Sequence, residues 1–109
     1  MGDTNYISGI VKILENPIET IYNENVSITQ FRVQLPQIRN NIIINLVFWG
    51  KLSQDIATYY KINDYIIIEG YLSLREKKKL QNSKTVEITV LKIYPFLLTD
   101  NRQINRDRV

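Results

Sequence analysis

Five short runs rich in β-branched and aromatic residues are the feature that most constrains the fold of this 109-residue chain. They cover residues 6–14, 26–35, 42–49, 65–75 and 85–93. In the second run Phe31, Val33 and Leu35 alternate with polar residues, which is the pattern of a strand with one buried face. Short strands separated by polar turns favour an all-β barrel or sandwich, and the length favours a single domain.

One helix is expected between the third and the fourth run. Apolar residues recur at helical spacing from Leu52 to Tyr60, which predicts a helix over about 51–60. Gly70 interrupts the fourth run and predicts a sharp bend or a bulge. Three strands, a helix and two strands is the order of the OB-fold, a five-stranded Greek-key barrel with its helix between strands three and four. The order of the strands and the helix alone is also compatible with SH3-like barrels and small α+β domains.

The composition excludes several classes of function. The chain has no cysteine and no histidine, which removes disulfides, thiolate zinc sites, thiol nucleophiles and the commonest general base. The carboxylates show no paired spacing of the kind that acid–base catalysis uses. We therefore expect no enzymatic activity, no metal and no cofactor. No apolar run approaches the roughly 18–20 residues that cross a bilayer, so we expect no membrane association.

The residues 48–75, FWGKLSQDIATYYKINDYIIIEGYLSLR, combine several motifs in one order. An aromatic–Gly–Lys–Leu element is followed by a helix with Ala and Tyr near its end, a turn with Lys, Asn and Asp, and an apolar strand that ends in Glu-Gly. This order and spacing resemble the single-stranded DNA-binding protein (SSB) family without a gap. The segments ENP at 15–17, ITQFRV at 28–33 and TVEITV at 85–90 extend the resemblance to about residues 6–94.

A closer likeness is to a compact SSB-like family of algal plastids and cyanobacteria. It rests on the segments VQLPQIR and FWGKLSQDI and on the short connection between them. The resemblance implies an OB-fold that binds single-stranded DNA independently of sequence, in DNA replication or maintenance, with RNA open as a second ligand. Abundant Ile, Asn, Lys and Tyr, whose codons are AT-rich, point with this resemblance to a plastid. The cytoplasm of a low-GC bacterium is the alternative.

The resemblance also bears on assembly. SSB proteins pair through their first strand, which implies a homo-oligomer here, a dimer or a tetramer. Bacterial SSBs end in an acidic tip that contains Phe and recruits other enzymes, whereas this chain ends NRQINRDRV. We therefore expect an OB-fold domain over 1–96, a short polar basic tail over 97–109, and no recruitment of enzymes by an acidic tail.

Trp49 is the leading candidate for stacking on a base, since it has the outward parity of the third run and the SSB family holds an aromatic residue there. The other interpretation is a half-buried tryptophan at a barrel rim or dimer interface. Tyr71 and Arg75 have outward parity on the fourth run, and Tyr71 is either a second stacking ring or a packing residue. Arg32 faces outward on the second run and can reach a phosphate or a base. Lys51 lies near the DNA path by resemblance.

A basic loop joins the fourth and fifth runs. Its lysines are Lys77, Lys78, Lys79 and Lys84. Such a loop neutralises several phosphates, or it is simply a solvated hairpin tip. The SSB family often has aromatic residues where this chain has Ile43 and Lys77, so we expect weaker binding than in a standard SSB, with Trp49 as the main stacking residue.

A different function remains open. The primosomal replication protein N of bacteria is an SSB relative that binds both DNA and proteins, and the segments SGIV and QFRV are similar to it. On this alternative, Trp49 and Tyr71 contact a protein partner. Glu69 and Glu87 share the outward parity of the proposed face and argue against a uniformly basic surface.

Overall fold

The computed structural model describes residues 5–36, 42–76 and 84–99 and contains six strands and one helix within them. The elements are β1 (Tyr6–Ile13), β2 (Glu19–Tyr22), β3 (Val26–Gln34), β4 (Ile43–Trp49), α1 (Lys51–Tyr59), β5 (Tyr65–Glu76) and β6 (Lys84–Leu97). The predicted helix and the five predicted strands are all present, each within a few residues of the expected bounds. In the described parts of the chain, no helix has the length and apolar character needed to cross a bilayer.

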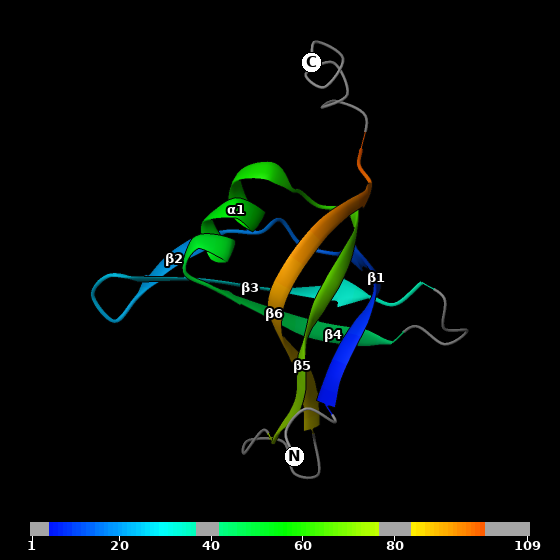
Figure 1. Cartoon of the computed structure of the whole chain (residues 1–109), viewed down its shortest axis with the longest axis horizontal. Helices are drawn as coiled ribbons and strands as arrows, with labels where there is room; N and C mark the ends of the chain where they lie inside the picture. Colours follow the sequence, from blue (N-terminus) through cyan, green and yellow to red (C-terminus); the bar gives the residue numbers. More distant parts are fainter. Residues whose placement is uncertain (1–4, 37–41, 77–83, 100–109) are drawn as a thin grey trace.

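Five of the strands close into a barrel (Figure 1). β1 pairs antiparallel with β5, β5 with β6, and β3 with β4, while β4 and β6 run parallel. The ring closes where the end of β1 pairs with β3, at Lys12–Gln34 and Ile13–Val33. With α1 between its third and fourth strands, this closed barrel confirms the predicted OB-fold topology.

The sixth strand, β2, was not predicted. Residues 15–25 looked like turn material because of Pro17 and several asparagines, but Glu19–Tyr22 extends β3 as an antiparallel hairpin. All four side chains of β2 are exposed, so the segment lacks the alternation that marks a half-buried strand. In Figure 1 the β2–β3 hairpin projects from the barrel on the left.

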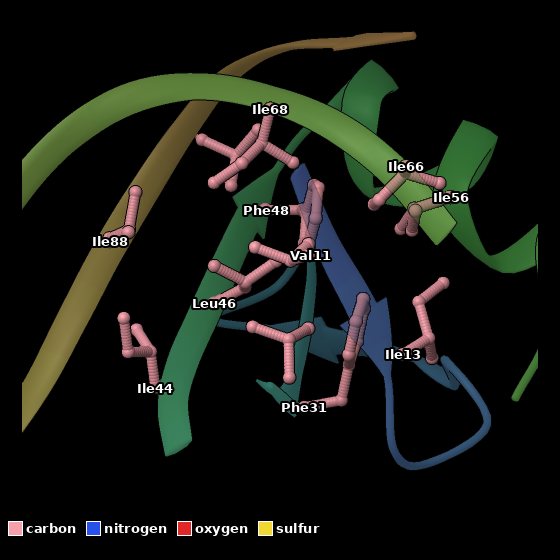
Figure 2. Packing of buried hydrophobic residues seen from close by; sticks show 12 residues of the cluster. Val11, Ile13, Phe31, Ile44, Leu46, Phe48, Ile56, Ile66, Ile68 and Ile88 are labelled. Atoms are coloured by element: carbon pink, nitrogen blue, oxygen red, sulfur yellow. The ribbon is translucent and has the colours of Figure 1, made fainter. Parts of the chain in front are cut away.

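The interior is filled by the inward-facing residues of the five barrel strands and by one face of the helix. Phe31 and Phe48 stack at a centroid distance of 5.3 Å with planes 13° apart. Figure 2 shows side chains from β1, β3, β4, β5, β6 and α1 converging on this interior. Ile56 of α1 is fully buried there, and Leu52 packs against the cluster. The helix therefore covers one opening of the barrel.

Gly50 lets the chain turn from β4 directly into α1. Its φ of 64° and ψ of −134° lie in a region that residues with a side chain rarely adopt. The Gly50 N–H donates to the Ser27 carbonyl at 2.8 Å, and Ser53 N–H donates to the Gly50 carbonyl at 2.9 Å. Beneath the helix, the buried hydroxyls of Ser53 and Thr29 lie 2.6 Å apart. Trp49 is thus fixed between a hydrogen-bonded turn and the β3–β4 ladder.

Gly70 produces the predicted bulge in the β5–β6 ladder. Glu69 pairs with Lys92 and Gly70 with Val90, so β6 contributes one extra residue, Leu91. A Cβ on Gly70 would lie 2.1 Å from the Thr89 carbonyl oxygen, which leaves no room for a side chain. The bulge bends the hairpin directly beside Tyr71.

The turn before β5 is anchored by the buried Asp64. Its carboxylate accepts from Lys61 N–H at 2.9 Å and from Thr99 N–H at 2.9 Å. Asn63, with φ of 77°, occupies the left-handed position of this turn, a conformation that Asn tolerates better than most residues. β6 runs on to Leu97, and Thr99 is held by Asp64, while residues 100–109 of the predicted tail lie outside the described residues.

Candidate nucleic-acid interface

The outer face of the sheet forms a continuous strip across five strands. Gln30, Val47, Thr89, Tyr71 and Tyr6 are successive cross-strand partners on β3, β4, β6, β5 and β1. Parity predicted that Val47 faces outward, but its side chain is only 4% exposed. β4 has a neighbour on either side, and a short side chain in the middle of a sheet is easily covered. The two aromatic residues of this strip, Tyr71 and Tyr6, therefore lie together on its β5 and β1 side.

Trp49 lies near the other end of the strip, two residues along β4 from Val47, and is 42% exposed. It pairs with Ile28 across the β3–β4 ladder. The exposed Tyr22 meets it in an edge-to-face arrangement, with centroids 5.5 Å apart and planes at 82°. Trp49 is thus a partly displayed ring with an aromatic neighbour on one side. Sequence reasoning did not place Tyr22, because β2 carries no burial pattern. The β-favouring residues TIY before the turn NEN were the available signal.

Tyr71 lies on the opposite side of the strip and is also 42% exposed. Its ring meets Tyr6 edge-to-face, at a centroid distance of 5.4 Å and an angle of 75°. The Tyr6 hydroxyl donates to Glu69 Oε1 at 2.5 Å. This bond to the carboxylate is the main cause that raises the pKa of Tyr6 to about 12. Glu69, which sequence reasoning left without a role, is therefore a hydrogen-bond acceptor for Tyr6.

Arg32 faces outward on β3, as parity predicted, and is paired. Its Nε donates to Glu15 Oε2 at 2.8 Å, and its backbone N–H donates to Glu15 Oε1 at 2.9 Å. The backbone hydrogen bond, together with the guanidinium, holds the pKa of the Glu15 carboxyl below its usual value. Both side chains remain substantially exposed, so the pair is solvent-screened. The charge of Arg32 is partly balanced by Glu15.

Lys51 begins α1 immediately after Trp49 and Gly50. Its side chain is 81% exposed, and Nζ lies 3.4 Å from Asp55 Oδ1, one helical turn away. An exposed pair of this kind holds its partners weakly. Lys51 therefore follows the Trp49 turn directly in the chain, and its ammonium group lies at a solvent-exposed position.

The basic loop lies largely outside the described residues. Lys77, Lys78 and Lys79 fall within 77–83, which the structure does not describe. The backbones of Arg75 and Lys84 do belong to the β5–β6 ladder, where they pair with Thr85 and Glu76. The predicted contribution of these cations to a binding face stays a prediction.

Glu87 occupies the centre of the neighbouring row of the strip. Arg32, Asn45, Glu87 and Ser73 are successive cross-strand partners there. Parity placed Glu87 outward, but it is only 7% exposed, so most of the carboxylate is withdrawn from solvent. This row therefore carries two ionisable side chains, the exposed Arg32 and the largely covered Glu87. Among the described residues, no group of three carboxylates is arranged to hold a metal ion.

Comparison with known proteins decides the family. Over 110 residues the chain is 41% identical to a protein of Trieres chinensis named "Putative single-stranded DNA-binding protein ycf41", and the match covers 94% of this chain and 96% of that protein. The chain belongs to the single-stranded DNA-binding protein (SSB) family. No protein-family model matches this SSB-family chain.

Solved SSB structures share its fold. The SSB domain of a Synechococcus sp. protein has a TM-score of 0.70 at 22% identity, covering 83% of this chain and 93% of that domain. The second single-stranded DNA-binding protein (SSBb) of Mycobacterium smegmatis has a TM-score of 0.68 at 18% identity, covering 84% and 87%. At these identities the likeness concerns the fold alone, and it confirms the predicted OB-fold for this member of the SSB family.

Proposed function

We propose that this protein binds single-stranded DNA independently of sequence, in DNA replication or maintenance. The observation that carries the proposal is the pair of exposed rings, Trp49 and Tyr71, on one outer face of an OB barrel. The name of the relative from Trieres chinensis supports it. The chain lacks histidine and cysteine, so a binding role fits it better than a catalytic one.

Exposed rings suit this ligand because every base has a flat face. Stacking of a base on an aromatic side chain contributes about 1–3 kcal/mol and tolerates any sequence. Trp49, the larger ring, is proposed as the main contact and Tyr71 as the second. Ile43 is exposed on the same face of β4, where an aliphatic side chain offers a base far less than an aromatic ring.

The register of the sheet sets how far apart the two rings lie. From β4 to β5 is two strand spacings, and Trp49 lies two residues along β4 from Val47, the residue in the row of Tyr71. With about 4.8 Å between strands and about 3.4 Å per residue, the two Cα atoms are about 12 Å apart. Adjacent bases in a duplex strand are about 3.4 Å apart. The rings therefore suit bases that are not direct stacked neighbours.

Cations around the strip are proposed to contact the phosphates. Arg32 lies on the outer face of β3, and Lys51 follows the Trp49 turn in the chain. Arg75, Lys77, Lys78, Lys79 and Lys84 are proposed to add to them from the β5–β6 hairpin. Each phosphate neutralised releases counterions, so binding weakens steeply with salt. Partial balancing of Arg32 by Glu15 and of Lys51 by Asp55 should make this dependence less steep than the same cations would give if they were unpaired.

We further propose that the protein acts as a homo-oligomer in a plastid. The second half of β6 exposes a series of large apolar side chains that a monomer leaves in water. They are Leu91, Tyr94, Phe96 and Leu97. Joining several barrels, each with two stacking rings, raises avidity for a long strand. The abundance of Ile, Asn, Lys and Tyr, whose codons are AT-rich, and the relative from Trieres chinensis support the plastid. Recruitment of other enzymes through an acidic tail is not part of the proposal.

A fluorescence titration tests the proposal directly, because Trp49 is the single tryptophan of the chain. We expect oligo-dT to quench its emission, and a duplex of equal charge to quench it much less. Binding should weaken by tenfold or more between about 50 and about 200 mM salt if several phosphates are contacted. Absence of both quenching and a mobility shift at low salt contradicts the proposal. Salt-independent binding of proteins without DNA binding favours the role resembling primosomal protein N.

A further inference from the structure

Both rings of the proposed site have the same kind of neighbour. Tyr22 from β2 meets Trp49, and Tyr6 from β1 meets Tyr71, each edge-to-face at about the same distance. An edge-to-face pair covers at most one face of each ring, which leaves a face open to a base. Such pairs are favourable by about 0.5–1.5 kcal/mol beyond the area that they bury. The two supporting tyrosines therefore restrict the rings without closing them off.

The Tyr6–Tyr71 pair has an anchor of its own. Glu69 lies two residues from Tyr71 on β5, so both side chains share the outer face, and its Oε1 accepts from the Tyr6 hydroxyl. A hydrogen bond to a carboxylate is roughly twice as strong as one between neutral groups. The Glu69 carboxylate also repels the phosphates of a DNA backbone that lies beside it. Glu69 therefore has two opposing effects on binding, which can be measured separately.

The Trp49–Tyr22 pair depends on a hairpin whose β2 strand adds no apolar side chain to the barrel core, although Glu19 accepts a hydrogen bond from the buried Ser27 hydroxyl at 2.6 Å. The four side chains of β2 are all exposed. The turn after it places two residues other than glycine at positive φ, Asn23 at 55° and Glu24 at 71°. Left-handed backbone at such residues is unfavourable, by about 1–3 kcal/mol in strained cases. Besides the Glu19–Ser27 hydrogen bond, the contact of Tyr22 with Trp49 explains a strand that has this cost and no buried side chain.

We propose that Tyr22, Tyr6 and Glu69 are positioning residues for DNA binding. Tyr22 holds the Trp49 ring, while Glu69 holds Tyr6 against the Tyr71 ring. Ordering a side chain on binding opposes association by about 0.5–1.5 kcal/mol, so a ring that is already ordered binds more tightly. The inference rests on the proposed function, since it assigns roles within the same site.

Two variants of Glu69 separate positioning from charge. Glu69→Gln removes the charge and keeps an acceptor for Tyr6, whereas Glu69→Ala removes both. Repulsion alone predicts that both variants bind oligo-dT more tightly than the wild type. Positioning predicts that Glu69→Gln binds equally or more tightly, and that Glu69→Ala binds about two- to tenfold more weakly than Glu69→Gln. Equal affinities of the two variants overturn the role of Glu69.

Tyr22 is tested with a conservative variant and a control on the same strand. We expect Tyr22→Phe to bind like the wild type, and Tyr22→Ala to lose about two- to tenfold in affinity. Ile21→Ala changes the opposite, exposed face of β2 and should leave binding unchanged. In the free protein, the fluorescence anisotropy of Trp49 should fall in Tyr22→Ala alone.

The outcomes distinguish this inference from the proposed function. A wild type that binds oligo-dT, with Tyr22→Ala equal to it in affinity and in Trp49 anisotropy, overturns the role of Tyr22 and leaves DNA binding intact. A wild type that does not bind oligo-dT contradicts the proposed function and the positioning roles together. An equal loss in Ile21→Ala and Tyr22→Ala assigns the effect to the hairpin and also overturns the role of the Tyr22 ring.

Discussion

The two ends of the aromatic strip reach similar ring pairs by different means. At one end Gly50 follows Trp49 and supplies a backbone conformation that side chains disfavour, with open space where a Cβ would be. At the other end Gly70 precedes Tyr71 and supplies space, because the Thr89 carbonyl occupies the position of a Cβ. One glycine is required for its dihedral angles and the other for its small size.

The ends also differ in charge. Trp49 pairs with Ile28 and meets Tyr22, whereas Tyr71 and Tyr6 lie with the carboxylate of Glu69. The Glu69 carboxylate repels a DNA phosphate that approaches Tyr71, whereas Ile28 and Tyr22 carry no charge that would repel one at Trp49. From this comparison we expect the Trp49 end to dominate affinity and the Tyr71 end to add reach along the strand.

Gly70→Ala should have the largest effect, on folding rather than on binding alone. The new Cβ meets backbone atoms of Thr89 and Val90, so the β5–β6 ladder has to shift. We expect the free energy of unfolding to fall by about 3 kcal/mol, at the upper end for overpacking. Gly50→Ala, which has space but a strained backbone, should lower it by about 1–2 kcal/mol. Urea denaturation measures both. If Gly70→Ala lowers the free energy of unfolding less than Gly50→Ala does, the result contradicts the conclusion that Gly70 is required for its small size.

Trp49→Ala should give the largest loss of DNA affinity without unfolding the protein. Removal of one stacking ring weakens binding by about 1–3 kcal/mol, or about 5- to 150-fold. Trp49→Phe should retain most of the affinity, since a ring remains. The anisotropy of a labelled oligo-dT reports binding without the tryptophan. The comparison between the two ends fails if Trp49→Ala binds within twofold of the wild type.

Tyr71→Ala should give a smaller loss that depends on the length of the oligonucleotide. We expect about a threefold to tenfold weaker Kd for long oligo-dT, near the lower limit for one stacked base. Oligonucleotides too short to span the two rings should show little change, because they occupy Trp49 alone. Tyr71→Phe is the matched control. An equal loss at every length contradicts the separation of the two rings.

Glu15 should give the smallest effect, confined to stability at acid pH. Hydrogen bonds from Arg32 hold the pKa of Glu15 below its ordinary value of 4.5, so the folded state favours the charged carboxylate. Its stabilising contribution is present above pH 4.5 and is lost as the pH falls through the lower, folded pKa. Glu15→Gln should flatten the pH dependence of the urea midpoint in the range just below pH 4.5, where the wild-type contribution is being lost. An unchanged slope in the variant would mean that the pair does not couple folding to protonation.

Much of the site could be predicted from the sequence because strand parity is local. Alternation along 42–49 and 65–75 was enough to put Trp49 and Tyr71 on the outer face, whichever barrel formed. Gly70 indicated its bulge in the same way, since a glycine inside an apolar strand often marks a bulge, a tight bend or the close approach of another backbone. Motif spacing, not composition, indicated the family.

Burial and pairing were decided only by the tertiary structure. Val47 and Glu87 have outward parity but are covered, since burial depends on what neighbouring strands contribute. Tyr6 and Glu69 are 63 residues apart in sequence, and their hydrogen bond exists because β1 and β5 pair in one register. Tyr22 reaches Trp49 through a strand with no burial pattern at all. The sequence by itself determined that Trp49 and Tyr71 face outward, whereas long-range strand pairing decided which tyrosine meets each of them.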